Sequence, residues 1–217
     1  MKQLGLAVVN YHAANGHYPP AFIADENGNP IHSWRVLILP YLEEQELFDR
    51  YDFTQPWNSE ANMRLATEMP SIYAFHGEYK PGTVTTNYLA VVGENTVWPG
   101  ATPRSTDEVT DQHSTTIMLV ENAGENVHWM EPRDLNAETM SLAVNNPKGV
   151  SSKYLAPAVA MLDDSLRRLE DELPENVFRA MLTVNGGERI ESTGNGWRLL
   201  PDGRLREELA GNAETQE

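Results

Sequence analysis

Apolar residues recur at helical spacing over residues 2–14, which predicts a helix that Asn15 and Gly16 bring to an end. The apolar positions form two stripes along this helix, one with Leu4, Val8 and Tyr11 and the other with Leu6 and Val9. One sheet face can bury only one such stripe well. We therefore expect the helix either to lie deep in a core or to be the lower part of a longer helix. In the second case, self-association or the segment at residues 197–200 would cover the Leu6 stripe.

Turn formers and caps divide the next segment into small elements. Asn27 and Gly28 suit a tight turn with positive φ, which predicts a hairpin. Ser33 can cap a following helix, and Pro40 interrupts the apolar pattern before it continues over residues 42–48. We expect two short helical pieces there.

From residue 71 the pattern changes to short β-rich runs separated by turns. Residues 72–75, 85–92 and 115–120 are rich in β-branched and aromatic side chains, which predicts strands. We expect residues 86–92 and 115–120 to pair in one antiparallel sheet. The polar stretch between them, residues 93–113, predicts a long surface loop with at most one helical turn.

Later in the chain the pattern predicts a hairpin and a short helix. Residues 158–169 form two apolar runs around an acidic turn at Asp163 and Asp164. Residues 177–182 follow Pro174 at helical spacing, and proline is tolerated in the first turn of a helix.

The order of these elements predicts the fold class and the domain organisation. Strands do not alternate with long helices, so the predicted class is α+β. We expect one domain over residues 1–190. The polar residues 191–217 predict a partly disordered extension whose last dozen residues are frayed.

Charge and composition narrow the range of partners. Aspartate and glutamate number 32 against 16 lysines and arginines, which gives a net charge of −16. Such a charge repels phosphate backbones and anionic membranes, so we expect no nucleic-acid partner. No run reaches the roughly 20 apolar residues that span a bilayer, so the chain as given is expected to be soluble. The absence of cysteine excludes disulfides and thiol chemistry.

No set of residues forms a recognisable catalytic pattern. The six histidines include no pair four residues apart on a predicted helix. Asp111, His113 and Ser114 are too close in sequence to place a nucleophile, a base and an orienting acid in line. Glycine motifs that bind phosphate are absent. The sequence therefore predicts a protein that is not an enzyme and needs no cofactor.

Acidic clusters are the candidates for a metal site. Calcium takes six to eight oxygen ligands, often from acidic loops, but no helix-loop-helix calcium pattern occurs. The alternative is a solvated acidic surface. The candidate calcium ligands are Asp107, Glu108, Asp111, Asp163 and Asp164.

Several blocks of the sequence carry a resemblance to a known family. They include Lys-Gln-Leu-Gly-Leu-Ala at 2–7, His-Ser-Trp-Arg-Val-Leu at 32–37, Thr-Asn-Tyr-Leu-Ala-Val-Val-Gly at 86–93, Trp-Met-Glu-Pro at 129–132 and Phe-Arg-Ala-Met-Leu at 178–182. With these blocks the chain resembles planctomycete pilin-like proteins of unknown function over about residues 1–190.

The resemblance implies a pilin-like fold, with an N-terminal helix packed on an antiparallel β-sheet and with a C-terminal hairpin and short helix. It also implies a pseudopilin-like role in a cell-envelope, type II secretion or pilus-type assembly. The expected location is then the envelope or periplasm, with protein partners or self-association through the N-terminal helix. Family members typically begin with a prepilin signal and an apolar anchor, which we expect this chain to lack because it starts inside their first helix.

The chain departs from the resembled family at several positions. The family often has one cysteine before the Lys2 block and another where Phe75 and His76 stand, and both are missing, as expected if the two formed a bridge. The family's His-x9-Asp-Gly element has Lys153 at the histidine position and Asp164 at the glycine position. No role that depends on that histidine is expected here.

A second interpretation of the chain is a small-ligand-binding module or an enzyme. Its pocket would be built on the loop at residues 93–113, with Trp98, Asp107, Asp111 and His113 as lining residues. Convergent polar groups in a deep apolar cleft would favour this interpretation, and a shallow acidic surface would favour assembly.

Overall fold

The computed structural model describes residues 1–154, 156–193 and 196–200. Its helices, with 3₁₀ helices labelled η, are α1 (Lys2–Asn15), α2 (Trp34–Leu37), η1 (Leu39–Leu42), α3 (Gln45–Arg50), α4 (Glu60–Met63), η2 (Ala66–Glu68), η3 (Ser71–Tyr73), η4 (Thr106–Glu108) and α5 (Glu175–Leu182). Its strands are β1 (Phe22–Ala24), β2 (Pro30–Ser33), β3 (Thr85–Thr86), β4 (Tyr88–Leu89), β5 (Val91–Val92), β6 (Ile117–Glu121), β7 (Val127–His128), β8 (Leu135–Asn136), β9 (Ala158–Met161), β10 (Leu166–Arg168), β11 (Ile190–Thr193) and β12 (Gly196–Leu199). The fold is therefore α+β.

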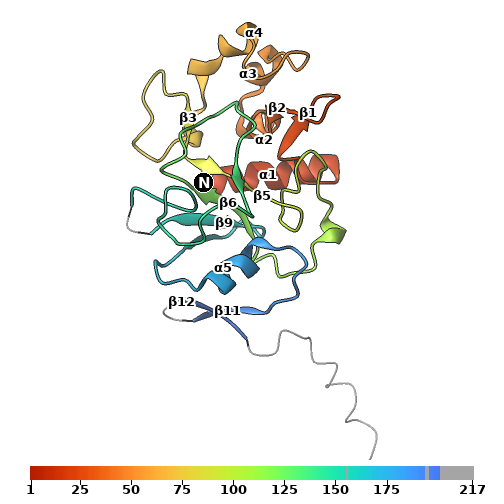
Figure 1. The fold of residues 1–217 in the computed structure, drawn as a ribbon. Coiled ribbons are helices and arrows are strands. Elements are labelled where there is room, and N and C mark those ends of the chain that lie inside the picture. The colour runs from red at the N-terminus through yellow and green to blue at the C-terminus, as the bar shows by residue number, and fades with distance from the viewer. Residues whose placement is uncertain (155, 194–195, 201–217) are drawn as a thin grey trace, which may run out of the picture.

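Helix α1 ends where the sequence predicts. Gly16 adopts the left-handed conformation at φ 77°, where glycine lacks the steric penalty of other residues, and its N–H donates to the His12 carbonyl at 2.8 Å. On one side of α1, Leu4, Ala7 and Val8 are completely buried. Figure 1 shows this helix crossing the molecule next to β6 and β9. None of the helices in the described ranges combines the length and apolar character that crossing a membrane requires.

The centre of the fold is a four-stranded antiparallel sheet in the order β10-β9-β6-β4. Every residue of the two middle strands, β6 and β9, is buried, as expected for strands that are covered on both faces. Helix α1 packs on one face and α5 on the other (Figure 1).

Alternation along the middle strands sorts side chains into two cores. Ala160 of β9 belongs to the core that includes α1, whereas its neighbours Val159 and Met161 belong to the core that includes α5. The α5 core is mostly aliphatic. The α1 core contains large aromatic side chains, among them Trp34, Trp98, Trp129, Tyr73 and Phe75.

Residues 72–75, predicted as a strand, are not one. The 3₁₀ helix η3 lies there instead, because the chain turns after Pro70 and the Tyr73 N–H donates to the Pro70 carbonyl at 3.0 Å. The turn buries the Tyr73 ring completely, and its hydroxyl donates to the Arg35 carbonyl at 2.6 Å. Tertiary burial of one aromatic residue thus overrides the local strand preference.

Residues 85–92, predicted as one strand, form three strands of two residues. Strand β3 pairs with β7, β4 joins the central sheet through β6, and β5 pairs in parallel with β8. Asn87 and Ala90 break the run because their N–H groups bond elsewhere, to the Tyr73 carbonyl at 2.8 Å and to Oδ1 of Asp134 at 2.8 Å. The predicted antiparallel pairing with residues 115–120 is therefore correct only at β4.

Several smaller predictions are confirmed and one is incomplete. The hairpin around Asn27 and Gly28 is β1-β2, the hairpin turning at Asp163 and Asp164 is β9-β10, and α5 follows Pro174. Ser33 caps α2 by accepting from the Arg35 N–H at 3.2 Å. The stretch after Ser33 contains three helical pieces, α2, η1 and α3, where two were predicted.

Strands β11 and β12 form a hairpin that packs on the α5 side of the sheet. Trp197 and Leu199 contact the α5 core there. Of the two covers predicted for the Leu6 stripe, self-association or residues 197–200, the second is therefore excluded, because α1 lies on the other face. The end of the chain, predicted to be frayed, lies outside the described residues.

Candidate functional site

A buried ion pair joins distant segments on the α1 side of the sheet. The Arg35 side chain is completely buried, and its Nη2 lies 2.6 Å from Oδ1 of Asp134, whose side chain is 2% exposed. Other guanidinium N–H groups donate to the Ser33 hydroxyl at 2.6 Å, to the Glu131 carbonyl at 3.3 Å and to the Tyr88 carbonyl at 3.4 Å. This network fastens α2 to β4 and to the turn before β8.

Opposing effects act on the carboxyl group of Asp134. Burial raises its pKa to about 6, while the charge of Arg35 and hydrogen bonds from the Ala90 N–H and the Trp34 indole oppose that rise. Perturbed pKa values occur in active sites and also in structural ion-pair networks. Both side chains of this pair are closed off from solvent, so the pair is structural.

His32 is a second buried titratable group on the same side. Its ring lies between the Tyr51 hydroxyl, 2.9 Å from Nδ1, and the Phe53 carbonyl, 3.0 Å from Nε2. A carbonyl only accepts, so Nε2 carries the proton and Nδ1 accepts from the tyrosine. Burial lowers the pKa of His32, which keeps the ring neutral. This ring too is a packing element.

The candidate pocket residues of the loop at 93–113 do not converge. Trp98 is completely buried, and its indole N–H donates to the Met118 carbonyl at 2.7 Å. Asp107 is exposed and His113 is half-buried. A cavity of about 250 Å³ beside the loop contains none of the four candidates, and its lining is Gly93, Glu94, Asn95, Thr96, Ala137, Glu138, Arg179, Leu182 and Thr183.

Two acidic residues of this loop accept hydrogen bonds from backbone N–H groups. Asp111 accepts from the N–H groups of Gly186 and Gly187 at 2.9 and 2.8 Å, which ties the loop to the segment after α5. Glu108 accepts from the Ser105 N–H at 2.7 Å and completes a capping box for η4, and it pairs with Arg104 at 3.1 Å. Both side chains therefore have structural partners.

The acidic turn of the β9-β10 hairpin contains two different carboxyl groups. Asp163 accepts from the Ser165 N–H at 3.0 Å and from its hydroxyl at 2.6 Å. Asp164 lies at φ 62°, in the left-handed region, and its buried Oδ1 has no hydrogen-bond partner. The resembled family has glycine at this position, which suits that conformation. In the described ranges, no three His, Asp or Glu side chains converge as a metal ion would require.

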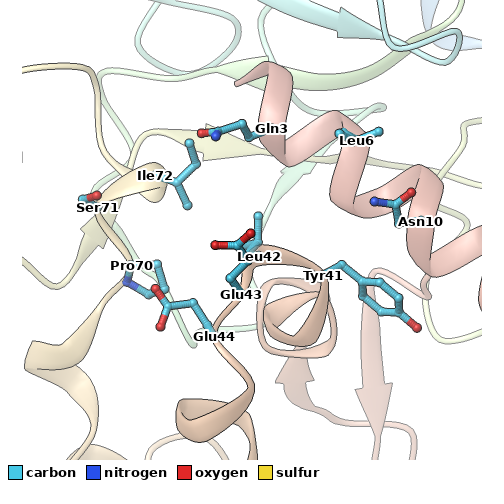
Figure 2. A pocket seen from close by; sticks show the side chains of 10 residues that line it. All are labelled: Gln3, Leu6, Asn10, Tyr41, Leu42, Glu43, Glu44, Pro70, Ser71 and Ile72. Carbon is cyan, nitrogen blue, oxygen red and sulfur yellow. The ribbon is translucent and has the colours of Figure 1, made fainter.

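A groove of about 420 Å³ runs beside the outward side of α1. Figure 2 shows residues of α1 on one side of it, the segment around η3 on the other, and the end of η1 with the residues that follow it between them. The groove is lined by Gln3, Leu6, Asn10, Tyr41, Leu42, Glu43, Glu44, Pro70, Ser71 and Ile72.

Apolar and acidic groups share this groove. Leu6 is 47% exposed, although the other side of the same helix is fully buried. Glu43 is exposed at φ 64°, and burial raises the pKa of its neighbour Glu44. Neither glutamate forms an ion pair with any described residue. The lining contains no lysine or arginine, so the groove is an acidic surface with an exposed leucine.

The α1 side of the groove was predictable from the sequence, and the side formed by the segments after η1 and around η3 was not. The predicted Leu6 stripe is exposed at Leu6 and half-buried at Val9. Glu43 and Glu44 are not among the predicted site residues, and they lie between η1 and α3 in the segment that Pro40 interrupts. The approach of η3 depends on the turn after Pro70, for which the sequence predicted a strand.

Comparison with known proteins identifies a family. The family model described as "Protein of unknown function (DUF1559)" matches residues 1–202, a range that includes both the buried ion pair and the groove. No curated protein and no solved structure gives a significant match.

Proposed function

Given that the chain belongs to the protein family of unknown function DUF1559, we propose that it is a non-enzymatic, pseudopilin-like component of a cell-envelope or secretion assembly. Its sequence blocks resemble those of planctomycete pilin-like proteins, which supports an N-terminal helix that serves assembly. The proposal also assigns the protein to the envelope or periplasm.

The observation that carries this proposal is the exposure of Leu6 in the groove beside α1. A scattered exposed leucine needs no explanation, but an exposed leucine in a concave surface between three segments is typical of a contact site. The inner side of α1 is fixed against the sheet by Leu4, Ala7 and Val8. The helix can therefore offer its other side to a neighbour without loosening the domain.

Cross-linking in the organism that encodes the protein tests this role. A photoreactive amino acid at position 6 should give discrete cross-linked products in the envelope fraction. The matched control is position 166, where Leu166 of β10 is 40% exposed but does not line the groove. Equal cross-linking at both positions, or a protein that fractionates away from the envelope, would contradict the proposal.

A further inference from the structure

The shape of the groove beside α1 suits an extended cylindrical partner. Gln3, Leu6 and Asn10 lie at helical positions i, i+3 and i+7, so they line the groove along two turns, or about 10 Å, of α1. The opposite wall is formed by Ser71 and Ile72 (Figure 2). A groove along a helix accepts the apolar side of a second helix through anchors at i, i+3 or i+4.

The charge of the groove indicates which side chains flank the apolar anchors of the partner helix. Glu43 and Glu44 bring two carboxylates to the groove without a cation among its lining residues. Elsewhere on the surface, carboxylates such as Glu60, Glu68 and Glu78 pair with arginine or lysine. Burial already removes part of the hydration of Glu44 and raises its pKa, so a cation placed there would compensate for lost hydration.

A second copy of the chain fits this charge poorly. Each copy carries a net charge of −16, which repels another copy over long range. Helix α1 contains one lysine, Lys2, and no arginine, so a second α1 would bring apolar side chains without flanking cations. The repulsion between copies and the single lysine of α1 therefore favour a helix from another protein.

We propose that the groove beside α1 binds an amphipathic helix of a different protein, in which lysine or arginine flanks the apolar anchors. This inference rests on the proposed assembly function and specifies the chemistry of the partner. The apolar anchors pack on Leu6, and the cations pair with Glu43 and Glu44. Apolar contact supplies affinity, and the acidic pair selects basic partners and accelerates their association.

Titration with a defined peptide tests the proposal. The probe is a 14-residue helical peptide of leucine and lysine with its leucines on one side, and the matched peptide has glutamate for every lysine. Calorimetry should detect binding of the lysine peptide alone. Leu6→Asn and the double variant Glu43→Gln/Glu44→Gln should each weaken binding about tenfold, as expected for anchors of an interface.

Two control variants separate groove binding from general attraction to an acidic protein. Leu166→Asn removes another exposed leucine, and Glu26→Gln/Glu138→Gln makes the same change in net charge on other surfaces. Both should leave the affinity within about twofold. Amide NMR shifts induced by the peptide should centre on Gln3, Leu6 and Ile72.

The proposal is overturned if groove and control variants weaken binding equally, or if the peptide shifts no groove residue. It is also overturned if the unmodified protein dimerises and Leu6→Asn alone abolishes the dimer, because the occupant is then a second copy. Either result leaves the assembly role intact. Failure of that role would appear separately, as loss of cross-linking at position 6 and of envelope location.

Discussion

The Arg35–Asp134 pair and the groove beside α1 lie on the same side of the sheet and differ in how their unusual groups are satisfied. The ion pair buries two charges, but every donor of Arg35 finds an acceptor. The groove exposes an apolar side chain and holds two carboxylates, and neither carboxylate pairs with a described residue. Buried groups that satisfy one another indicate a structural role, whereas the exposed leucine and the two carboxylates of the groove are the groups on which the proposed contact rests.

The largest expected effect comes from breaking the buried pair. Asp134→Asn leaves the Arg35 charge buried without its counter-ion, so the free energy of unfolding should fall by about 3–5 kcal/mol. Urea unfolding measures this change. The matched control, Glu68→Gln, removes a partner of Arg50 in an ion pair that is nearly half exposed, and its effect should be far smaller. Similar losses in both variants would contradict the structural assignment.

The opposite substitution adds a pH dependence. In Arg35→Met, Asp134 can take up a proton, whereas Arg35 in Asp134→Asn stays charged. The folded-state pKa of Asp134 is raised above its unfolded value, so the stability it contributes is present at low pH and lost as pH rises through about 6. Loss of the Arg35 charge raises that pKa further, so Arg35→Met should destabilise less at about pH 5 than at about pH 7.5. Asp134→Asn removes the titrating group, so its cost should be smaller at about pH 7.5 than at about pH 5. A constant cost for both variants would contradict this reasoning.

The close approach of α1 to the sheet predicts a coupled pair of smaller effects. Alanine in place of glycine usually stabilises a helix by about 1 kcal/mol. At Gly5 the added Cβ would lie 2.7 Å from Oδ1 of Asp164, and this close contact should cancel the gain in Gly5→Ala. Asp164→Gly should itself stabilise by about 1 kcal/mol, because glycine suits the positive φ and removes a buried unpartnered oxygen. In that background Gly5→Ala should become stabilising. Additive effects in thermal melts of the three variants would show that the two residues do not touch.

A smaller pH effect is expected from His32. Burial lowers the folded-state pKa of His32. Below about pH 6.5 the unfolded chain therefore binds a proton that the folded protein does not, and the free energy of unfolding decreases as the pH is lowered. His32→Gln should remove this part of the loss. The test compares the change in unfolding free energy between about pH 7.5 and 5.5 in both proteins. Identical changes would show that His32 titrates freely.

The smallest expected effect sharpens the contrast between the two sides of α1. Leu6→Asn should change the free energy of unfolding by no more than about 0.5 kcal/mol, because the side chain is half exposed. Leu4→Ala, on the buried side, should cost about 2–5 kcal/mol. Thermal melts of both variants check this, and a collapse of Leu6→Asn would show that its own domain encloses α1.

Local signals predicted the elements that local chemistry determines. Helix α1 ends at Asn15 because Gly16 caps it in the left-handed conformation that glycine favours, and the hairpin of β9 and β10 turns at its acidic residues. Residues 85–92 were mispredicted because Asn87 and Ala90 bond to Tyr73 and Asp134, partners far away in the sequence. No local pattern contains that information.

The candidate site was predictable to the same limited extent. The second apolar stripe of α1 pointed to Leu6, since helical spacing alone decides which side a residue occupies. The place of Glu43 and Glu44 in the groove depends on the segment after η1, and the Arg35–Asp134 pair joins residues 99 positions apart. Both require the folded arrangement of distant segments.

The division of residues 85–92 into β3, β4 and β5 has a consequence for the kinetics of folding. Each of these dipeptides pairs with a different segment, β7, β6 or β8, and all three partners come much later in the chain. Large loops must close before any of these pairs forms, and non-local pairing of this kind slows folding relative to local contacts. The early part of the chain, which includes α1 and the segment of Glu43 and Glu44, is therefore expected to stay incompletely enclosed until the later strands pair.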